Sequence, residues 1–187
     1  VADIRGTSPK VWNAWKGKLL EDLYRSTRRI LRGDTEYAAK SIEAKKAEAL
    51  RILRQYVHDD RAHEALWKHF GENYFQRFEA SEIGWHTRTL FLRPAPERPV
   101  VRARLSPIGE GLQVMVYAHD QPGVFARITG YFERHQFDIA AAKIYTTGHG
   151  FALDGFQILS RARAGEHYRD LIHKVETGLA AALDPAT

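Results

Sequence analysis

The sequence has no cysteine. This absence excludes disulfide bonds and metal sites built from thiolates, and it is typical of proteins that stay in a reducing compartment. No apolar run approaches the roughly 20 residues of a membrane span, and no signal peptide is recognisable. We therefore expect a cytoplasmic protein with no membrane partner.

The chain also lacks a strong excess of charge of either sign, since its net charge is +5 over 187 residues. The excess belongs to residues 1–93, with 18 lysines and arginines against 13 acids, whereas residues 94–187 carry ten of each. Because acids are interleaved with these bases, a solvated helix surface is favoured over a nucleic-acid interface. We expect no nucleic-acid partner.

Residues 1–93 have the apolar periodicity of helices. Ser8 and Pro9 form a start signal for the first helix, and a second helix is expected over 35–57. Ser81 is a candidate cap for a helix that reaches Phe91. Four tryptophans lie in this half and are expected in the core or on a docking surface. They are Trp12, Trp15, Trp67 and Trp85.

Three prolines within 94–99 mark the boundary, because this stretch cannot continue a helix and favours an extended linker. After it the apolar period changes from 3.6 to 2, which predicts one domain over 100–187. The expected order is ββαββα, in an α+β fold with helices on one face of an antiparallel sheet. The expected strands and helices are 100–105, 112–119, 123–135, 138–146, 151–159 and 164–183.

The most informative stretch joins the strand over 112–119 to the helix that follows. Asp120 can cap the turn, Pro122 suits a first helical turn, and Gly123 allows close approach of the backbone. A helix N-terminus offers free N–H groups that attract a carboxylate or a phosphate. The residues alone leave two interpretations open, which are a small-anion site and a capped joint without a ligand.

Several segments carry a family resemblance. Residues 120–125, 138–146 and 152–156 resemble an ACT domain, a small ferredoxin-like module that senses amino acids. Residues 11–24, 74–78 and 83–88 resemble other parts of the bifunctional PII uridylyltransferase/uridylyl-removing enzymes, also called [protein-PII] uridylyltransferases. The likeness is collinear over nearly the whole chain.

This resemblance implies a piece of a multifunctional enzyme with nucleotidyltransferase, HD hydrolase and two ACT domains. Residues 1–93 would be the tail of the HD domain and a helical connector, and 100–187 the first ACT domain. The chain opens at Val1, in mid-pattern, which fits a piece of a longer protein. The family transfers UMP from UTP to the PII signalling protein and hydrolyses that bond, with magnesium or another divalent metal, in nitrogen regulation.

The same resemblance implies that this piece is not catalytic, needs no cofactor of its own and senses glutamine. Asp3 resembles the last metal ligand of the HD domain, whose partners would lie upstream. In the ACT domain the glutamine carboxylate would meet backbone N–H groups, Asp120 would orient the turn and Asp138 would meet the α-ammonium group. The implied site residues are Asp120, Gln121, Pro122, Gly123, Val124, Phe125 and Asp138.

Two departures from the family pattern affect these expectations. Asp138 stands where the family usually has asparagine, and an ionised carboxylate cannot donate to a ligand oxygen. The chain also shows no clear fourth strand after its last helix. We expect the strand over 100–105 to take that edge position, antiparallel to the strand over 112–119.

Other candidate groups favour structural roles. His119 beside Asp120 resembles a metal-binding dipeptide, but a strand end supplies no helical cradle for a metal. His58, His63 and His69 are better explained as capping and exposed residues. Asp154 is expected to pair with Lys143 on the neighbouring strand.

The face formed by Met115 and Tyr117 is expected to pack on the helical half or on the second ACT domain. A rival interpretation makes the chain an interaction module that docks domains without binding a small molecule. That rival predicts an exposed apolar surface on the helix that carries Trp12 and Trp15.

Overall fold

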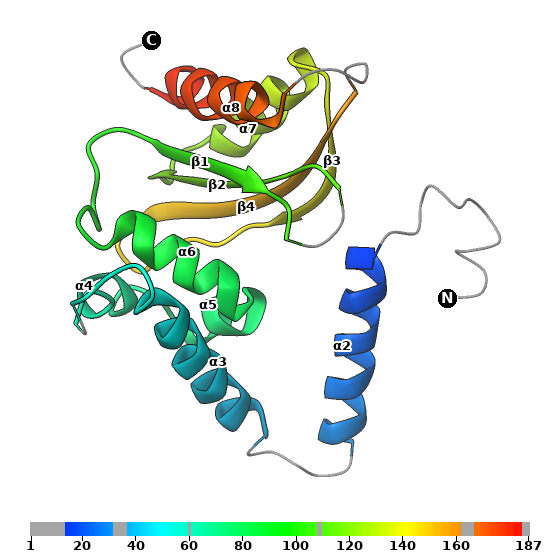
Figure 1. Cartoon of the computed structure of the whole chain (residues 1–187), viewed down its shortest axis with the longest axis vertical. Helices are drawn as coiled ribbons and strands as arrows, with labels where there is room; N and C mark the ends of the chain where they lie inside the picture. The colour runs from blue at the N-terminus through cyan, green and yellow to red at the C-terminus, as the bar shows by residue number, and fades with distance from the viewer. Residues whose placement is uncertain (1–13, 32–36, 60, 108–109, 162–166, 185–187) are drawn as a thin grey trace, which may run out of the picture.

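The computed structural model describes residues 14–31, 37–59, 61–107, 110–161 and 167–184. Within these ranges the first half is helical and the second half forms a four-stranded sheet with two helices (Figure 1), as expected for an α+β fold. Ser8, Pro9 and Trp12 lie outside the described residues. No helix in these ranges is long and apolar enough to span a membrane.

The helical half contains short and medium-length helices. Its elements are α2 (Ala14–Ile30), α3 (Tyr37–Leu53), α4 (Glu64–Trp67), α5 (Glu72–Arg77) and α6 (Ala80–Leu90). The expected cap at Ser81 is wrong, because the N-cap of α6 is Glu79, two residues earlier. The carboxylate of Glu82 accepts the N–H of Glu79 at 2.7 Å, so an acid in the first turn satisfies the helix start.

The sheet has the strand order β1-β2-β4-β3, with every neighbouring pair antiparallel. Its strands are β1 (Val100–Leu105), β2 (Leu112–His119), β3 (Phe137–Lys143) and β4 (Phe151–Ser160). The hairpin connection pairs β1 with β2, so that Val101 lies opposite Val116. This confirms that the strand over 100–105 takes the edge position beside β2.

Helices α7 (Val124–Arg134) and α8 (Tyr168–Leu183) cover one face of the sheet (Figure 1). The core on this face contains Val114, Val116, Ile128, Phe132, Phe156, Ile158, Val175 and Leu179. These residues come from alternate positions of β2 and β4 and from the apolar stripes of the two helices. The sequence periodicity therefore predicted this layer correctly.

The helical half covers the opposite face of the sheet, which makes the sheet the middle of three layers (Figure 1). The second core contains Tyr74, Phe75, Phe78, Ile83, Met115, Tyr117 and Leu153, all at most 3% exposed. Met115 and Tyr117 thus pack on the helical half, which was one of the two expectations for that face. The proline-rich stretch joins two halves that share a core.

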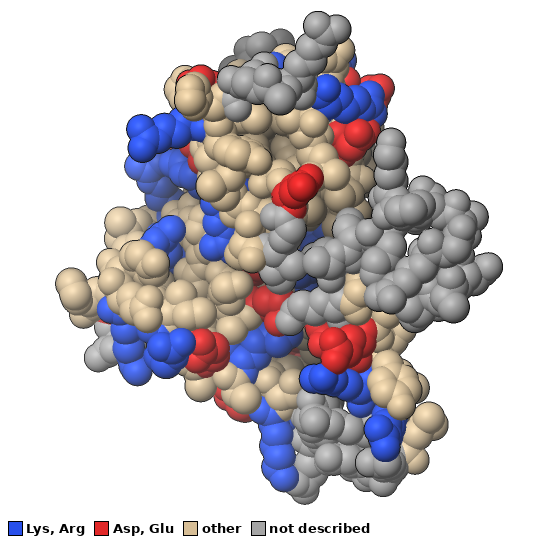
Figure 2. Space-filling view, turned by 45° about the vertical axis from the view of Figure 1, so that its right-hand side comes forward, with Lys and Arg blue, Asp and Glu red and all other residues tan. Residues whose placement is uncertain are grey.

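Helix α2 lies at the side of the three layers (Figure 1). The side chains of Leu23 and Tyr24 on this helix are 60% and 63% exposed. The face shown in Figure 2 carries described side chains of both charges, with several basic ones gathered at its upper left.

Candidate functional site

The predicted ligand loop, Asp120–Gly123, leads from the end of β2 into α7. Gly123 is the N-cap of α7 and has a φ of 88°, a left-handed conformation that glycine adopts without strain. A Cβ atom at this position would meet nothing within 4 Å. The glycine is therefore required by the backbone conformation of the loop and not by crowding.

Asp120 ties the loop to the neighbouring turn at 146–150. Its N–H donates to the carbonyl oxygen of Gly150 at 2.9 Å, and its carboxylate accepts the hydroxyl of Thr146 at 2.9 Å. The N-cap residue of α7 is Gly123, so the expectation that Asp120 caps the turn is corrected. Its role is to hold two loops together at one end of the sheet.

The start of α7 presents backbone donors to solvent. The first N–H groups of an α-helix lack intrahelical acceptors and carry the positive end of the helix dipole. Gln121, Pro122 and Gly123 are exposed, and the ring of Phe125 is 49% exposed beside them. Val124 is buried, and its N–H donates to the carbonyl oxygen of Gln121 at 3.2 Å. This surface can hold a carboxylate through the remaining N–H groups.

The structure does not bring Asp138 to this loop. Asp138 follows the C-terminal end of α7, and a helix of 11 residues is about 16 Å long. One glutamine molecule cannot span that length, so it cannot touch both the loop and Asp138 of the same domain. Arg161 Nε donates to Asp138 at 2.8 Å, and this hydrogen bond lowers the pKa of the carboxyl group.

Asp154 is buried on the α7 side of the sheet. Its carboxylate accepts the N–H of Tyr145 at 3.4 Å, and burial raises its pKa to about 6, with a smaller contribution from the nearby Asp120 charge. The expected pair with Lys143 is wrong, because Lys143 lies opposite Gly155 and its Nζ bonds Glu82 at 2.6 Å. Side chains of adjacent strand residues point to opposite faces.

The turn at 147–150 docks on the helical half. The N–H of Gly148 donates to the carbonyl oxygen of His69 at 2.9 Å, and the rings of His69 and His149 stack with centroids 3.8 Å apart. His149 Nε2 also lies 2.9 Å from the carbonyl oxygen of Pro94. The sequence marked this stretch only as a turn, and nothing local signals its contact with a helix-end residue some 80 positions away.

Metal-binding expectations are limited by the described ranges. No group of three or more His, Asp or Glu side chains there is placed to hold a metal ion. His119 packs against Phe151 with ring centroids 4.2 Å apart. Asp3, the expected partner of an upstream metal site, lies outside the described residues.

Comparison with known proteins matches both halves of the chain to family descriptions. Residues 37–89 match the family described as "Uridylyltransferase GlnD fifth domain", and residues 112–171 match the ACT domain. The first match covers α3 to α6, and the second covers β2 to the start of α8. No solved structure matches the chain.

Curated relatives are similar over nearly the whole chain. The bifunctional uridylyltransferase/uridylyl-removing enzyme of Thiobacillus denitrificans is 52% identical over 186 residues, which are 100% of this chain and 22% of the relative. The enzyme of the same name from Ralstonia nicotianae is 54% identical over 183 residues, 96% of this chain and 21% of the relative. The chain therefore spans about a fifth of the length of these relatives, and it belongs, as a segment, to the family of bifunctional uridylyltransferase/uridylyl-removing enzymes.

Proposed function

We propose that this chain is a non-catalytic regulatory segment of a bifunctional enzyme and that its ACT domain binds glutamine. The parent would transfer UMP from UTP to the PII protein and remove it by hydrolysis, with magnesium or another divalent metal bound elsewhere. The supporting observation is the exposed helix start at Gly123, tied through Asp120 to a turn that contacts the helical half.

The glutamine carboxylate binds at the start of α7. Residues 121–123 and 125 are exposed at the start of this helix, and the helix dipole favours a negative group there. The half-exposed ring of Phe125 offers an apolar surface for the aliphatic part of the ligand. The α-ammonium group needs a partner other than Asp138 of the same domain.

The second ACT domain of the parent is the partner proposed for that purpose. Strand β3 is an edge of the sheet, and Asp138 and Ile139 are exposed on it. An exposed edge strand offers unpaired backbone groups to another sheet. A second domain along β3 would bring Asp138 near a ligand that the partner domain holds. In return, an acidic group of the partner domain would lie near the ligand held by the loop at 120–125.

The turn at 147–150 carries the effect of the ligand to the connector. A ligand that orders the Asp120 loop also orders Thr146 and Gly150, which bond Asp120 directly. The same turn holds His69 and Pro94 through Gly148 and His149. Ligand binding would thereby change the free-energy balance between two orientations of the connector, which is coupling between sites.

A matched pair of substitutions in the full-length parent tests this function. Phe125→Pro removes one N–H of the first turn, where proline is best tolerated in a helix, and Phe125→Ala removes the ring but keeps the N–H. We expect Phe125→Pro to need at least about tenfold more glutamine to switch from UMP transfer to UMP removal, because one charge-assisted hydrogen bond contributes about 1.5–3 kcal/mol.

Phe125→Ala should respond to glutamine at a lower concentration than Phe125→Pro. Equal responses of the parent and a folded Phe125→Pro protein would contradict the loop site. They would favour the alternative function, in which the ACT domain docks other domains without a small molecule.

A further inference from the structure

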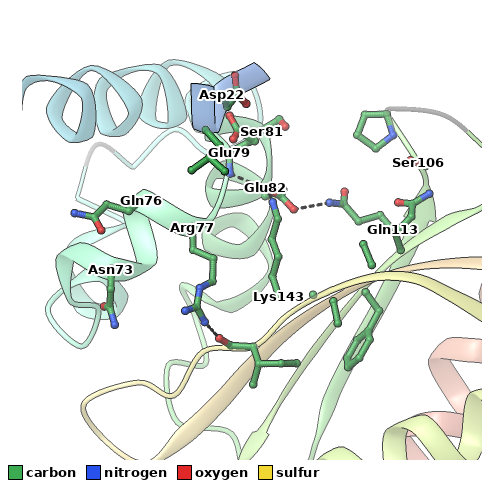
Figure 3. A pocket seen from close by; sticks show the side chains of 18 residues that line it. Asp22, Asn73, Gln76, Arg77, Glu79, Ser81, Glu82, Ser106, Gln113 and Lys143 are labelled. Atoms are coloured by element: carbon green, nitrogen blue, oxygen red, sulfur yellow. Dashed lines mark hydrogen bonds and ion pairs between the residues drawn. The ribbon is translucent and has the colours of Figure 1, made fainter. Parts of the chain in front are cut away.

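A cavity lies between the helical half and the sheet, away from the Asp120 loop (Figure 3). Its volume is about 780 Å³, which is within the range of small-molecule sites. Helices α2, α5 and α6 form one side, and β2, β3 and β4 form the other. Nothing in the proposed loop site uses these residues.

A buried ion pair lies in the wall of this cavity. The Glu82 carboxylate, 6% exposed as a residue, accepts Lys143 Nζ at 2.6 Å and Gln113 Nε2 at 2.8 Å (Figure 3). With the N–H of Glu79 it has three donors, so its geometry is fixed. A buried ion pair is weak evidence for stability, because desolvation offsets the attraction of the charges. A polar, well-ordered wall is instead what a binding site needs.

A second group of polar side chains lies across from Gln113 in Figure 3. Arg77 donates to the carbonyl oxygen of Ile144 through one nitrogen of its guanidinium, whose other nitrogen donors remain for a ligand. The amides of Asn73 and Gln76 come from the same helix, α5. Glu79 adds a half-buried carboxylate at the start of α6.

The residues that the sheet contributes to the cavity wall are mostly small or apolar. Ala141 and Gly155 occupy positions where larger residues would fill the space. A Cβ atom at Gly155 would lie 3.3 Å from the ring of Phe78, so this position has little room for a side chain. The cavity therefore combines an apolar floor with charges of both signs and neutral amides.

We propose that this cavity binds a small zwitterion, an α-amino acid or a dipeptide. Arg77 would hold the carboxylate, Glu79 would hold the ammonium group, and the amides would bond the rest of the molecule. A pure anion is disfavoured because the walls carry the acids Asp22, Glu79 and Glu82 beside the bases Arg77 and Lys143. The occupant would touch connector helices and sheet together, so it would stabilise one arrangement of these layers.

NMR titration of the 187-residue chain tests the proposal. The probes are the free α-amino acids and alanyl-glutamine, each at millimolar concentration, together with the N-acetylated form of any that binds. We expect at least one probe to shift the backbone signals of Ala141 and Gly155 saturably. N-acetylation should weaken that probe at least tenfold, because it removes the ammonium charge.

Substitutions separate this cavity from the loop. Ala141→Phe should abolish these shifts by filling the cavity, and Ala141→Ser should keep them. Should Ala141→Phe fail to fold, Arg77→Met gives the same test, with an expected tenfold or greater loss of affinity. Phe125→Pro should leave these shifts unchanged.

Three results would overturn the proposal. The first is that no probe shifts the signals of Ala141 or Gly155. The second is that the shifts persist at full affinity in both Ala141→Phe and Arg77→Met. In the third result, the only signals that move are those of residues 121–125 and the turn. That outcome would support glutamine binding at the loop and would show that the cavity takes no zwitterion.

Discussion

At the residue scale, the buried carboxyl group of Asp154 makes the stability of the chain depend on pH. In the folded chain its pKa is about 6, whereas the ordinary value is 3.8. The folded state therefore binds more protons between about pH 4 and pH 6, and stability falls as pH rises through this window, by about 3 kcal/mol.

Asp154→Asn should remove this loss. The difference in the free energy of unfolding between Asp154→Asn and the parent chain should rise by about 3 kcal/mol from pH 4 to pH 7, as measured by urea denaturation. The difference between the two chains is used because His86 contributes a pH dependence of stability with the opposite sign, which both chains share. Burial lowers the pKa of His86 to about 3, so its contribution is present above about pH 6.5 and is lost on acidification.

Asp138→Asn is the control of opposite sign. The pKa of this exposed carboxyl group is lowered by the hydrogen bond from Arg161, so its contribution is present above its ordinary pKa and is lost in acid. A flat difference curve for Asp154→Asn between pH 4 and pH 7 would contradict the buried, protonated state.

The pair of Glu82 and Lys143 gives a second prediction at this scale. Lys143→Met leaves the Glu82 carboxylate buried without its cation and should destabilise the chain by about 3 kcal/mol or more in urea denaturation. Adding Glu82→Gln to Lys143→Met should restore part of that stability, because no buried charge is left. A double variant as unstable as the sum of the two single variants would contradict a direct pairing.

The same residues show where sequence reasoning failed. The loop at Asp120 was found because Asp, Pro and Gly between a strand and a helix are a local signal. The expected pair of Lys143 and Asp154 was wrong because cross-strand pairing depends on register, and β3 shifts its register between Ile139 and Ala141. One residue of shift moves a side chain to the other face of the sheet.

At the scale of elements, helices α3 to α6 act as the cover of a sheet face. Met115, Tyr117 and Leu153 are fully buried beneath them. A chain restricted to residues 94–187 should therefore expose this apolar face and form aggregates or unfold, as measured by size-exclusion chromatography and circular dichroism.

A chain restricted to residues 37–187 is the matched control. It lacks α2, whose Leu23 and Tyr24 are largely exposed, and it should remain monodisperse and unfold cooperatively. A monodisperse, cooperatively unfolding 94–187 fragment would show that the cover is dispensable.

The existence and type of most elements followed from periodicity, including β1 at the sheet edge. Strand and helix periods are local properties, whereas the choice of cover for the second sheet face is not. The apolar pattern of Met115 and Tyr117 required a partner but fitted both the helical half and another domain. The start of α6 was misplaced because Glu79 and Glu82 cap it, and acids outside the usual N-cap set are a weak signal.

At the scale of the whole molecule, the turn at 147–150 joins the proposed ligand loop to the helical connector. Sequence resemblance supplied the family and the loop residues, but it placed Asp138 in the same site as Asp120. The length of α7 separates them, which only the arrangement of the complete domain shows. That separation is the reason for proposing a site shared between two ACT domains.

The most direct test is an NMR titration with glutamine of a chain that extends from residue 1 through the second ACT domain of the parent, because that domain is proposed to hold the α-ammonium group. We expect saturable shifts at residues 121–125, accompanied by smaller shifts in the turn at 147–150 and at His69. Phe125→Pro should weaken them at least about tenfold, which corresponds to about 1.4 kcal/mol. An absence of shifts at residues 121–125 with millimolar glutamine would contradict the claim that this loop senses glutamine.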